Sequence, residues 1–311
     1  MNWLEKYRPF NFTSLLIDQD KKTLLMNFVK NKDLPHMIFH GPPGTGKTSC
    51  AYIIAYKLFG ESLSKQVLEL NASDDRGIKA IREKIKNFVL EKQTKESMKI
   101  IILDEADSLT LDSQFALRRI IEDNSKSIRF MIICNYINKI IEPIKSRCMM
   151  ISFESLSKEL FEKCIDRILE KEKIKKNPQL IEELYKYTNG DLRKSINMLY
   201  NVYVLDDEMK SETLKEISDY VPNKIIDDLF VNEFDNKQML GYCKMLMKKN
   251  YSYTSIINSS IDYIMEKIED DKIKSELLIK MADFEYQLLS KSDYLVQLLM
   301  LILFIKIKTS K

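Results

Sequence analysis

The sequence predicts an α/β domain with a central parallel sheet, followed by regions made only of helices. Through the first half of the chain, short apolar runs bounded by polar residues alternate with helical stretches, as expected for strands buried on both faces of a parallel sheet. After Phe153 the pattern becomes helical. The length of 311 residues exceeds one compact core and suits two or three domains. We expect domains at residues 1–153, 154–210 and 211–311.

Five apolar runs are the expected strands of the sheet. They lie at residues 37–39, 67–70, 99–103, 128–134 and 149–153. A helix is expected over residues 47–58, directly after a glycine-rich turn. Another is expected over residues 78–90, where apolar residues recur at helical spacing.

Helix-start signals mark the region after the sheet. Amphipathic spacing predicts a helix over residues 160–174, and Asn177-Pro178 opens a further one. Asp191 is placed to cap the next helix. From about Ser211 onward few Gly or Pro residues interrupt the pattern, and we interpret this part as four or five helices.

Composition places the chain among ordinary soluble globular proteins, with 45% hydrophobic and 31% charged residues. A net charge of +3 means that nucleic-acid binding must rest on a local patch. The five cysteines form no C-x-x-C pair, which disfavours zinc and favours a reduced intracellular compartment. The charged opening residues predict no signal peptide. The apolar run at 294–305 is shorter than the roughly 20 residues of a membrane span, so we expect a buried helix and no membrane association.

A phosphate-binding loop follows the first expected strand. It matches the pattern G-x-x-x-x-G-K-[ST] and consists of Gly41, Pro42, Pro43, Gly44, Thr45, Gly46, Lys47 and Thr48. The glycines let backbone N–H groups surround a β-phosphate, and the following helix N-terminus favours negative charge. We expect Lys47 to reach the β- and γ-phosphates and Thr48 to offer its hydroxyl to Mg²⁺. A chance glycine-rich turn is a poor alternative, because the motif stands between a strand and a helix as it must.

Two carboxylates end the apolar run at 99–103. Asp104 is placed to hold the Mg²⁺ shell, and Glu105 to polarise an attacking water molecule. A solvated acidic turn is the alternative, and the nearby phosphate loop weakens it. Together, the two motifs predict hydrolysis of a nucleoside triphosphate.

The loop resembles the form found in AAA+ ATPases, and further motifs of that family follow in its order. Asn135 ends a strand and resembles sensor 1, which lies beside the attacking water and the γ-phosphate. Arg147, in Ser-Arg-Cys, resembles the arginine that clamp-loader subunits insert into the neighbouring subunit's ATP site. Arg193, in Gly-Asp-Leu-Arg, resembles sensor 2, which contacts the γ-phosphate from a helical lid. The resemblance implies ATP and Mg²⁺ as cofactors.

Three further stretches resemble small subunits of replication factor C. They are Trp-Leu-Glu-Lys-Tyr-Arg-Pro at 3–9, Leu-Asn-Ala-Ser-Asp-Asp-Arg-Gly at 70–77 and Ala-Leu-Arg-Arg at 116–119. In that family the N-terminal segment packs against the adenine, so the resemblance implies nucleotide contacts from Arg8 and Leu16. The resemblance covers about the first two hundred residues and weakens in the C-terminal helices. Asn135-Tyr136 inclines the interpretation toward a eukaryotic subunit, with an archaeal one still open.

This resemblance implies a function and partners. The chain would bind and hydrolyse ATP within a hetero-pentamer of clamp-loader subunits, joined through a helical collar. The assembly would open a sliding clamp and load it onto primer–template DNA in replication and repair. The expected compartment is the nucleus for a eukaryotic source and the cytoplasm otherwise.

A basic stripe follows the helix expected over residues 78–90. Lys79, Arg82 and Lys86 fall within a narrow arc beside the apolar stripe. Because the corresponding helix of replication factor C follows the duplex backbone, the resemblance assigns these residues, together with Arg76, to DNA phosphate contacts. The alternative is an ordinary solvated edge of the helix.

The end of the same helix suggests a docking element for the clamp. Ile85, Phe88 and Val89 resemble the apolar part of a peptide that docks on sliding clamps. We expect Phe88 and Val89 to be exposed near the helix end. The alternative, that these side chains belong to the core of the subunit, applies most to Ile85.

Other interpretations of these arginines and of the whole chain stay open. Arg147 could instead stabilise a helix C-terminus by its charge. Arg193 could instead be an ordinary surface residue. Arg118 and Arg119 suit either a helix-face ion pair or an interface. The rival functions are another AAA+ ring, either a checkpoint clamp loader or a branch-migration helicase, and a non-hydrolysing scaffold. The Asp-Glu-Ala-Asp sequence at 104–107 also occurs in DEAD-box helicases, but the second half of the chain shows no second series of strands.

Overall fold

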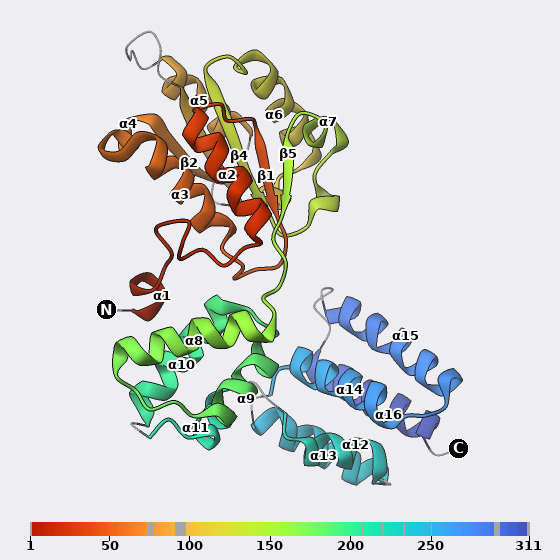
Figure 1. Cartoon of the computed structure of the whole chain (residues 1–311). Helices are drawn as coiled ribbons and strands as arrows, with labels where there is room; N and C mark the ends of the chain where they lie inside the picture. The colour runs from red at the N-terminus through yellow and green to blue at the C-terminus, as the bar shows by residue number, and fades with distance from the viewer. Residues whose placement is uncertain are drawn as a thin grey trace. The chain divides into compact units, whose positions relative to one another are not determined.

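The chain folds into two compact units, Met1–Lys210 and Ser211–Lys311. Figure 1 traces the whole chain, and each unit is described here by itself. The computed structural model describes residues 2–73, 78–90, 98–206, 208–218, 221–232, 234–249, 251–288 and 293–309.

A five-stranded parallel sheet forms the centre of the first unit, with the strand order β2-β3-β4-β1-β5. The strands are β1 (Met37–His40), β2 (Val67–Asn71), β3 (Lys99–Asp104), β4 (Ile128–Cys134) and β5 (Met149–Ser152). Each of the five predicted apolar runs is a strand, and no boundary differs from the prediction by more than one residue. The predicted α/β class with a parallel sheet is therefore confirmed.

Helices cover both faces of the sheet, because side chains alternate along each strand. On one face, Phe39 and its neighbours pack against α2 (Gln19–Asn31) and α3 (Lys47–Phe59). On the other face, Ile38 and its neighbours pack against three helices. These are α5 (Ile78–Leu90), α6 (Leu111–Asp123) and α7 (Glu142–Lys145). Phe39 and Ile38 are both fully buried, and each contributes roughly 1.5–3 kcal/mol by leaving water.

Three helices follow the sheet within the first unit, as the sequence predicts. They are α8 (Lys158–Glu172), α9 (Pro178–Thr188) and α10 (Leu192–Leu205). Asn177 caps α9, and Asp191 caps α10 by accepting a hydrogen bond from the Lys194 backbone N–H at 3.1 Å. The predicted helix start at Asn177-Pro178 and the predicted cap at Asp191 are both confirmed. The naming of residues 154–210 as a lid domain stays a prediction.

Short elements complete the first unit. They are α1 (Trp3–Lys6), α4 (Leu63–Gln66) and the 3₁₀ turns η1 (Gly60–Ser62), η2 (Ala106–Ser108) and η3 (Ile137–Lys139). Trp3 on α1 is buried against α10, with its ring centroid 5.1 Å from that of Tyr203 and 5.4 Å from that of Tyr200. The N-terminal segment is thus fastened to the helical part of this unit.

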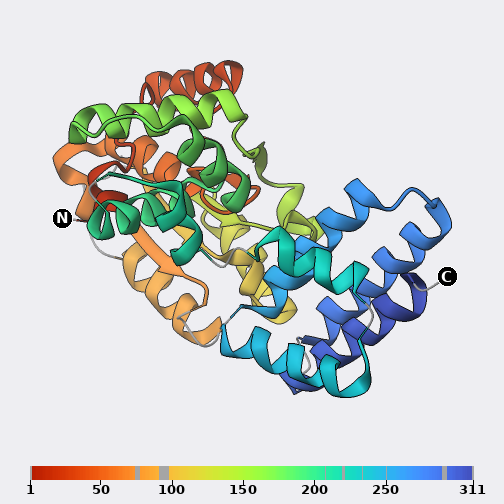
Figure 2. The ribbon, with the colours of Figure 1, turned by 90° about the horizontal axis from the view of Figure 1, so that it is seen from below.

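The second unit contains six helices in its described residues, where the sequence predicted four or five. They are α11 (Ser211–Ile217), α12 (Asn223–Val231), α13 (Asn236–Lys248), α14 (Tyr253–Lys267), α15 (Asp271–Leu288) and α16 (Tyr294–Thr309). The count was wrong because α11 and α12 span only seven and nine residues, too few to show a clear period. Helices α12 and α13 pack against α16, and α14 packs against α15, as Figure 2 shows in cyan to blue.

Helix α16 contains the apolar run predicted as a buried helix. One face is buried, through Leu298, Leu301 and Ile305, while Val296 and Ile307 are exposed. The prediction is therefore right for one side of the helix only. Within the described parts of the chain, no helix combines the length and the apolar character needed to cross a membrane.

Candidate nucleotide site

A pocket lies at the carboxyl edge of the sheet, where the loop after β1 faces α10 and the N-terminal segment. It gathers twelve of the residues predicted for the site: Arg8, Leu16, Pro43, Gly44, Thr45, Gly46, Lys47, Thr48, Asp104, Glu105, Asn135 and Arg193. The topology explains this convergence. Strand β4 lies between β3 and β1, so Asn135 at its end stands between Asp104 and the loop.

Lys47 begins α3 and turns back into the phosphate-binding loop. Its Nζ donates hydrogen bonds to the carbonyl oxygens of Gly41 at 2.7 Å and Pro42 at 2.6 Å. Burial lowers the pKa of Lys47, and the nearby carboxylate of Asp104 opposes that shift. Gly46 precedes the helix with φ 93° and without a side-chain cap. The first turn of α3 therefore presents backbone N–H groups and a positive dipole end to the pocket.

Thr48 and Asp104 join the two halves of the predicted phosphate site. The Thr48 hydroxyl donates a hydrogen bond to Asp104 Oδ2 at 2.9 Å. The other carboxylate oxygen, Asp104 Oδ1, accepts from the Glu105 backbone N–H at 2.8 Å. These contacts aim one hydroxyl and one carboxylate oxygen at the same place, although 56 residues separate them in the sequence.

Glu105 stands at a strained turn directly after β3. Its φ of 54° lies in the left-handed region, which is uncommon for a residue other than glycine and occurs often at functional sites. Its side chain is exposed and lines the pocket. Two residues later, Asp107 Oδ2 accepts a hydrogen bond from the Tyr136 backbone N–H at 3.3 Å. Asp107 thereby links the turn after β3 to the turn that carries Asn135, a role that sequence reasoning missed.

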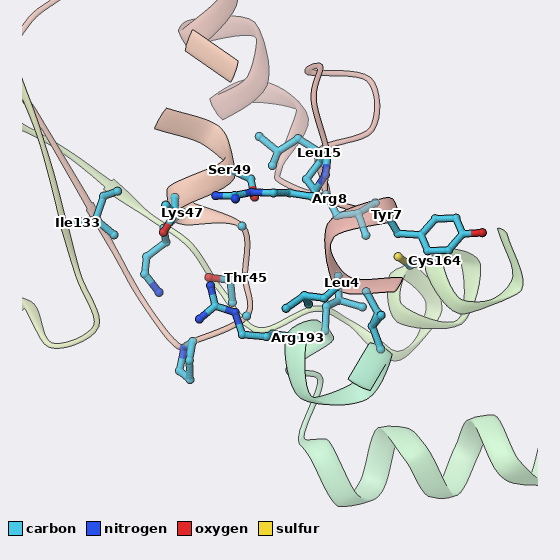
Figure 3. Close-up of a pocket in the computed structure, with 18 of the residues that line it drawn as sticks. Leu4, Tyr7, Arg8, Leu15, Thr45, Lys47, Ser49, Ile133, Cys164 and Arg193 are labelled. Carbon is cyan, nitrogen blue, oxygen red and sulfur yellow. The ribbon is translucent and has the colours of Figure 1, made fainter. Parts of the chain in front are cut away.

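The start of α10 touches the phosphate-binding loop. A Cβ atom at Gly44, whose φ is +72°, would lie 1.9 Å from Asp191 Oδ1. A side chain at position 44 would have to displace Asp191. Arg193 lies two residues further along, and Figure 3 shows its side chain extending from α10 toward Thr45 in the loop. The helical part of the first unit thus closes one side of the pocket.

The N-terminal segment supplies the apolar side of the pocket. Leu4, Tyr7 and Leu15 line it, as Figure 3 shows, whereas the buried Trp3 does not. The Arg8 guanidinium lies over the ring of Tyr52 on α3, 5.0 Å from its centroid. This arrangement orients a cation at the rim of the pocket.

Two further lining residues, Cys164 on α8 and Ile196 on α10, were not predicted. Both occupy ordinary positions on amphipathic helices, so the sequence carries no signal that separates them from core residues.

A carboxylate from α8 holds the N-terminal segment. Glu172 Oε1 accepts hydrogen bonds from Lys6 Nζ at 2.6 Å and from the Tyr7 hydroxyl at 2.5 Å. The bond from Lys6 contributes most to lowering the pKa of Glu172, so the carboxylate stays ionised at neutral pH. These contacts connect α1 and α8 beside the pocket.

Arg147 does not line this pocket. Its NH2 lies 2.6 Å from Glu122 Oε1 on α6, and its NH1 donates to the Pro143 carbonyl at 2.8 Å. Arg118 donates from Nε to the same Glu122 oxygen at 3.0 Å. The helix-face ion pair considered for Arg118 is therefore present, and Arg147 also makes a contact to the short helix that precedes it.

The basic stripe is described only in part. Lys86 is exposed on α5, whereas Arg76 and the side chains of Lys79 and Arg82 lie outside the described residues. The expectation for the end of this helix was wrong for Phe88. That side chain is 7% exposed and packs in the core beneath the sheet, with Lys99 Nζ 4.7 Å from its ring centroid. Val89 packs against the same core and is half-buried.

Comparison with known proteins follows the same division of the chain. The family described as "ATPase family associated with various cellular activities (AAA)" matches residues 37–156, and "Replication factor C C-terminal domain" matches residues 221–303. The probable replication factor C subunit 5 of Dictyostelium discoideum is 38% identical, over 95% of this chain and 88% of the relative. The chain belongs to the replication factor C small-subunit family.

Eukaryotic and archaeal members of the family match this chain about equally well. The replication factor C small subunit of Picrophilus torridus is 39% identical, over 92% of this chain and 91% of the relative. Replication factor C subunit 4 of Homo sapiens is 37% identical, over 96% of this chain and 86% of the relative. Identity therefore does not favour a eukaryotic over an archaeal source.

Solved structures share the fold at lower identity. The Thermotoga maritima RuvB Holliday junction branch migration motor aligns with a TM-score of 0.53 at 17% identity, covering 78% of this chain and 80% of that one. At this identity the likeness establishes a common AAA+ architecture and nothing about activity. The chain thus carries an AAA ATPase domain with a nucleotide-binding pocket.

Proposed function

We propose that this chain is an ATP-hydrolysing subunit of a hetero-pentameric clamp loader. The assembly would open a sliding clamp and load it onto primer–template DNA during replication and repair. The observation that carries the proposal is the 2.9 Å hydrogen bond between Thr48 and Asp104, in a chain of the replication factor C family. It unites the phosphate-binding loop with the acidic strand end in one pocket.

The residues of this pocket divide the work on ATP. Lys47, now bonded to two loop carbonyls, would exchange these acceptors for β- and γ-phosphate oxygens. Arg193 would contact the γ-phosphate from the side of α10. Glu105 would accept a proton from the attacking water, and Asn135 would orient that water. The apolar side formed by the N-terminal segment would receive the base.

Thr48 and Asp104 suit a Mg²⁺ ion bound with the nucleotide. Magnesium prefers oxygen ligands, and a hydroxyl and a carboxylate already converge here. The ion would neutralise charge that develops on the phosphate oxygens. Binding of the ion would replace the hydrogen bond between the Thr48 hydroxyl and the Asp104 carboxylate. Both oxygen ligands therefore lie close together before the ion binds.

Arg147 would complete the ATP site of the adjacent subunit. It is exposed and lies outside the pocket of its own chain, which supports a role toward a neighbour. A guanidinium at that position would stabilise the transferred phosphoryl group. A ring of subunits is required for this contact, in keeping with the word "subunit" in the names of the relatives.

We assign DNA phosphate contacts to four basic residues: Lys79, Arg82, Lys86 and Arg76. The exposure of Lys86 supports this assignment. Phe88 is not a docking residue for the clamp, because its side chain is buried. The clamp as a partner is instead supported by the family alone.

The rival functions have less support. A branch-migration motor matches by fold at 17% identity, whereas replication factor C relatives reach 37–39% over most of the chain. A non-hydrolysing scaffold has no need for Lys47, Thr48, Asp104 and Glu105 in one pocket. A checkpoint loader that shares this subunit is compatible with the same pocket.

ATPase stimulation tests the proposal. The complex containing this chain is purified from its source, its components are identified, and steady-state hydrolysis is measured with sliding clamp, primer–template DNA or four-way junction DNA. We expect a sliding clamp together with primer–template DNA to stimulate hydrolysis more than either alone. Stimulation by four-way junctions with no response to the clamp would overturn the clamp-loader function.

A further inference from the structure

Three charged side chains form a cluster outside the nucleotide pocket, on α6 and just after α7. Glu122 Oε1 accepts from Arg118 Nε at 3.0 Å and lies 2.6 Å from Arg147 NH2. The Arg118 and Glu122 side chains stand one turn apart on α6, while Arg147 arrives from a segment 25 residues later. One carboxylate oxygen thus joins two guanidinium groups from different parts of the chain.

The Arg147 guanidinium makes three contacts within the chain and keeps further N–H donors available. Its NH1 contacts the Pro143 carbonyl at 2.8 Å and the Ser146 hydroxyl at 3.3 Å, and its NH2 contacts Glu122. A guanidinium has five N–H donors. Within the described part of the chain, the contacts of Arg147 leave its Nε–H and one NH2 hydrogen for another acceptor. The cluster therefore orients Arg147 without consuming it.

Charge in this cluster also favours an anion from outside. Two guanidinium groups and one carboxylate carry a net charge of +1, and the three side chains are 35–39% exposed. The hydrogen bond from Arg118 is the main cause that lowers the pKa of Glu122, so this carboxylate is charged at neutral pH. Ion pairs this exposed contribute little to stability. Their consequence is geometric, because a long, flexible side chain is held in one orientation before a ligand arrives.

We propose that Glu122, supported by Arg118, is a positioning residue for Arg147 in the ATP site of the adjacent subunit. The inference rests on the proposed role of Arg147 toward that neighbour. Glu122 fixes the guanidinium against α6, so that its remaining donors meet the γ-phosphate when two subunits come together. The opposite arrangement, in which Glu122 restrains Arg147 and competes with the phosphate, predicts faster hydrolysis once Glu122 is neutralised.

The test uses the assembled complex with a single active ATP site. The active site is that of the neighbour that receives Arg147. The other sites are inactivated by substitutions in their phosphate-binding loops. This chain carries Glu122→Gln, Arg147→Ala or both. The control is Glu142→Gln, the same chemical change in an exposed carboxylate that pairs with Lys145 at 2.7 Å on α7. We measure kcat and KM for ATP in the neighbour's site, and hydrolysis in this chain's own site in a second set of complexes.

For Glu122→Gln we expect kcat in the neighbour's site to fall about 10–100-fold, the loss typical of a displaced catalytic group, with KM for ATP changed less than about twofold. Glu142→Gln should have no effect. The double variant should be no slower than Arg147→Ala, since both changes remove the same contribution. Glu122→Asp, which keeps the charge, should recover part of the rate.

Three results would overturn the proposal: an unchanged kcat with Glu122→Gln, a raised kcat, or additive losses in the double variant. These results can be distinguished from a failure of the proposed role of Arg147 in the neighbour's site. If Arg147→Ala leaves the neighbour's site at full rate, the role of Arg147 is wrong and the positioning role of Glu122 falls with it. If Arg147→Ala is slow and Glu122→Gln is normal, only the positioning role is wrong.

Discussion

Two clusters of charge in the first unit differ in the direction they face. In the nucleotide pocket, Lys47 is 6% exposed and donates two hydrogen bonds to loop carbonyls, beside the hydrogen-bonded pair Thr48–Asp104. On α6 and after α7, Arg147 and Glu122 are about one third exposed, and Arg147 keeps N–H donors available. The first cluster lines the pocket of its own chain, whereas the second lies outside that pocket. In the ring that we propose, each chain would contribute its own nucleotide pocket and an arginine that faces the neighbouring subunit.

Among the substitutions that test this comparison, those in the nucleotide pocket should have the largest effects on hydrolysis and ATP binding. Glu105→Gln should lower kcat about 10²–10⁴-fold, the usual contribution of a general base, while ATP affinity changes little. Lys47→Ala should instead weaken ATP binding about 10–150-fold, because each lost hydrogen bond to a charged group is worth roughly 1.5–3 kcal/mol. Equilibrium nucleotide binding and single-turnover hydrolysis in the assembled complex separate the two. Full-rate turnover by Glu105→Gln, with the other sites silenced, would remove Glu105 from its assigned role.

The next effect concerns stability and the corrected position of Phe88. Phe88→Ser should lower the free energy of unfolding of the first unit by about 3–5 kcal/mol, as expected for loss of a buried aromatic ring. Phe115→Ser provides the matched control, since Phe115 lies on α6 and is 50% exposed. That change should cost at most about 0.5 kcal/mol. Urea denaturation of the full chain measures both, and equal losses would contradict the burial of Phe88.

A smaller effect tests the contact between α10 and the phosphate-binding loop. Gly44 and Gly46 both have positive φ, +72° and +93°, so alanine strains the backbone at either position. Only at Gly44 would the new Cβ displace Asp191 from its capping position, which adds about 1 kcal/mol of lost helix stability. Gly44→Ala should therefore destabilise the first unit more than Gly46→Ala by that amount, measured by urea denaturation.

A second variant makes the same comparison stricter. In an Asp191→Ala background the cap is already absent, so the difference between Gly44→Ala and Gly46→Ala should disappear. A difference that persists would show that Gly44 matters for a reason other than the approach of Asp191.

The smallest expected effect concerns the basic stripe of α5. Replacing Lys79, Arg82 and Lys86 by alanine should weaken primer–template binding and lower the salt slope of log K by about 0.9 for each lost phosphate contact. ATP binding should be unchanged. The control replaces three lysines of α2 and α3, which cover the opposite face of the sheet: Lys22, Lys30 and Lys57. Equal losses from both triple variants, measured as affinity against salt concentration, would return the stripe to an ordinary solvated helix edge.

Much of the first unit could be predicted because its signals are local. Each strand is a short apolar run with polar ends, and the glycines of the loop after β1 report a backbone that other residues cannot adopt. Parallel pairing then places the ends of β1, β3 and β4 at one edge of the sheet. The core of the nucleotide site follows from those facts alone.

The features that could not be predicted depend on contacts between distant parts of the chain, which leave no local sequence pattern. Glu122 and Glu172 look like ordinary solvated carboxylates on amphipathic helices, and their partners Arg147 and Lys6 lie 25 and 166 residues away. Phe88 was misjudged because position near a helix end says little about which way a side chain points once the helix packs on a sheet. Short helices such as α11 likewise lack the length over which a period becomes visible.

Whether Arg147 acts in the neighbour's ATP site or in its own can be measured directly. Complexes are assembled in which only this chain carries Arg147→Ala, and hydrolysis is measured separately in its own ATP site and in the neighbour's. We expect the neighbour's site to slow by about 10³–10⁵-fold, the range observed for arginines in phosphoryl transfer, and the chain's own site to stay normal. A slow site in the mutated chain beside a normal neighbour would contradict this expectation.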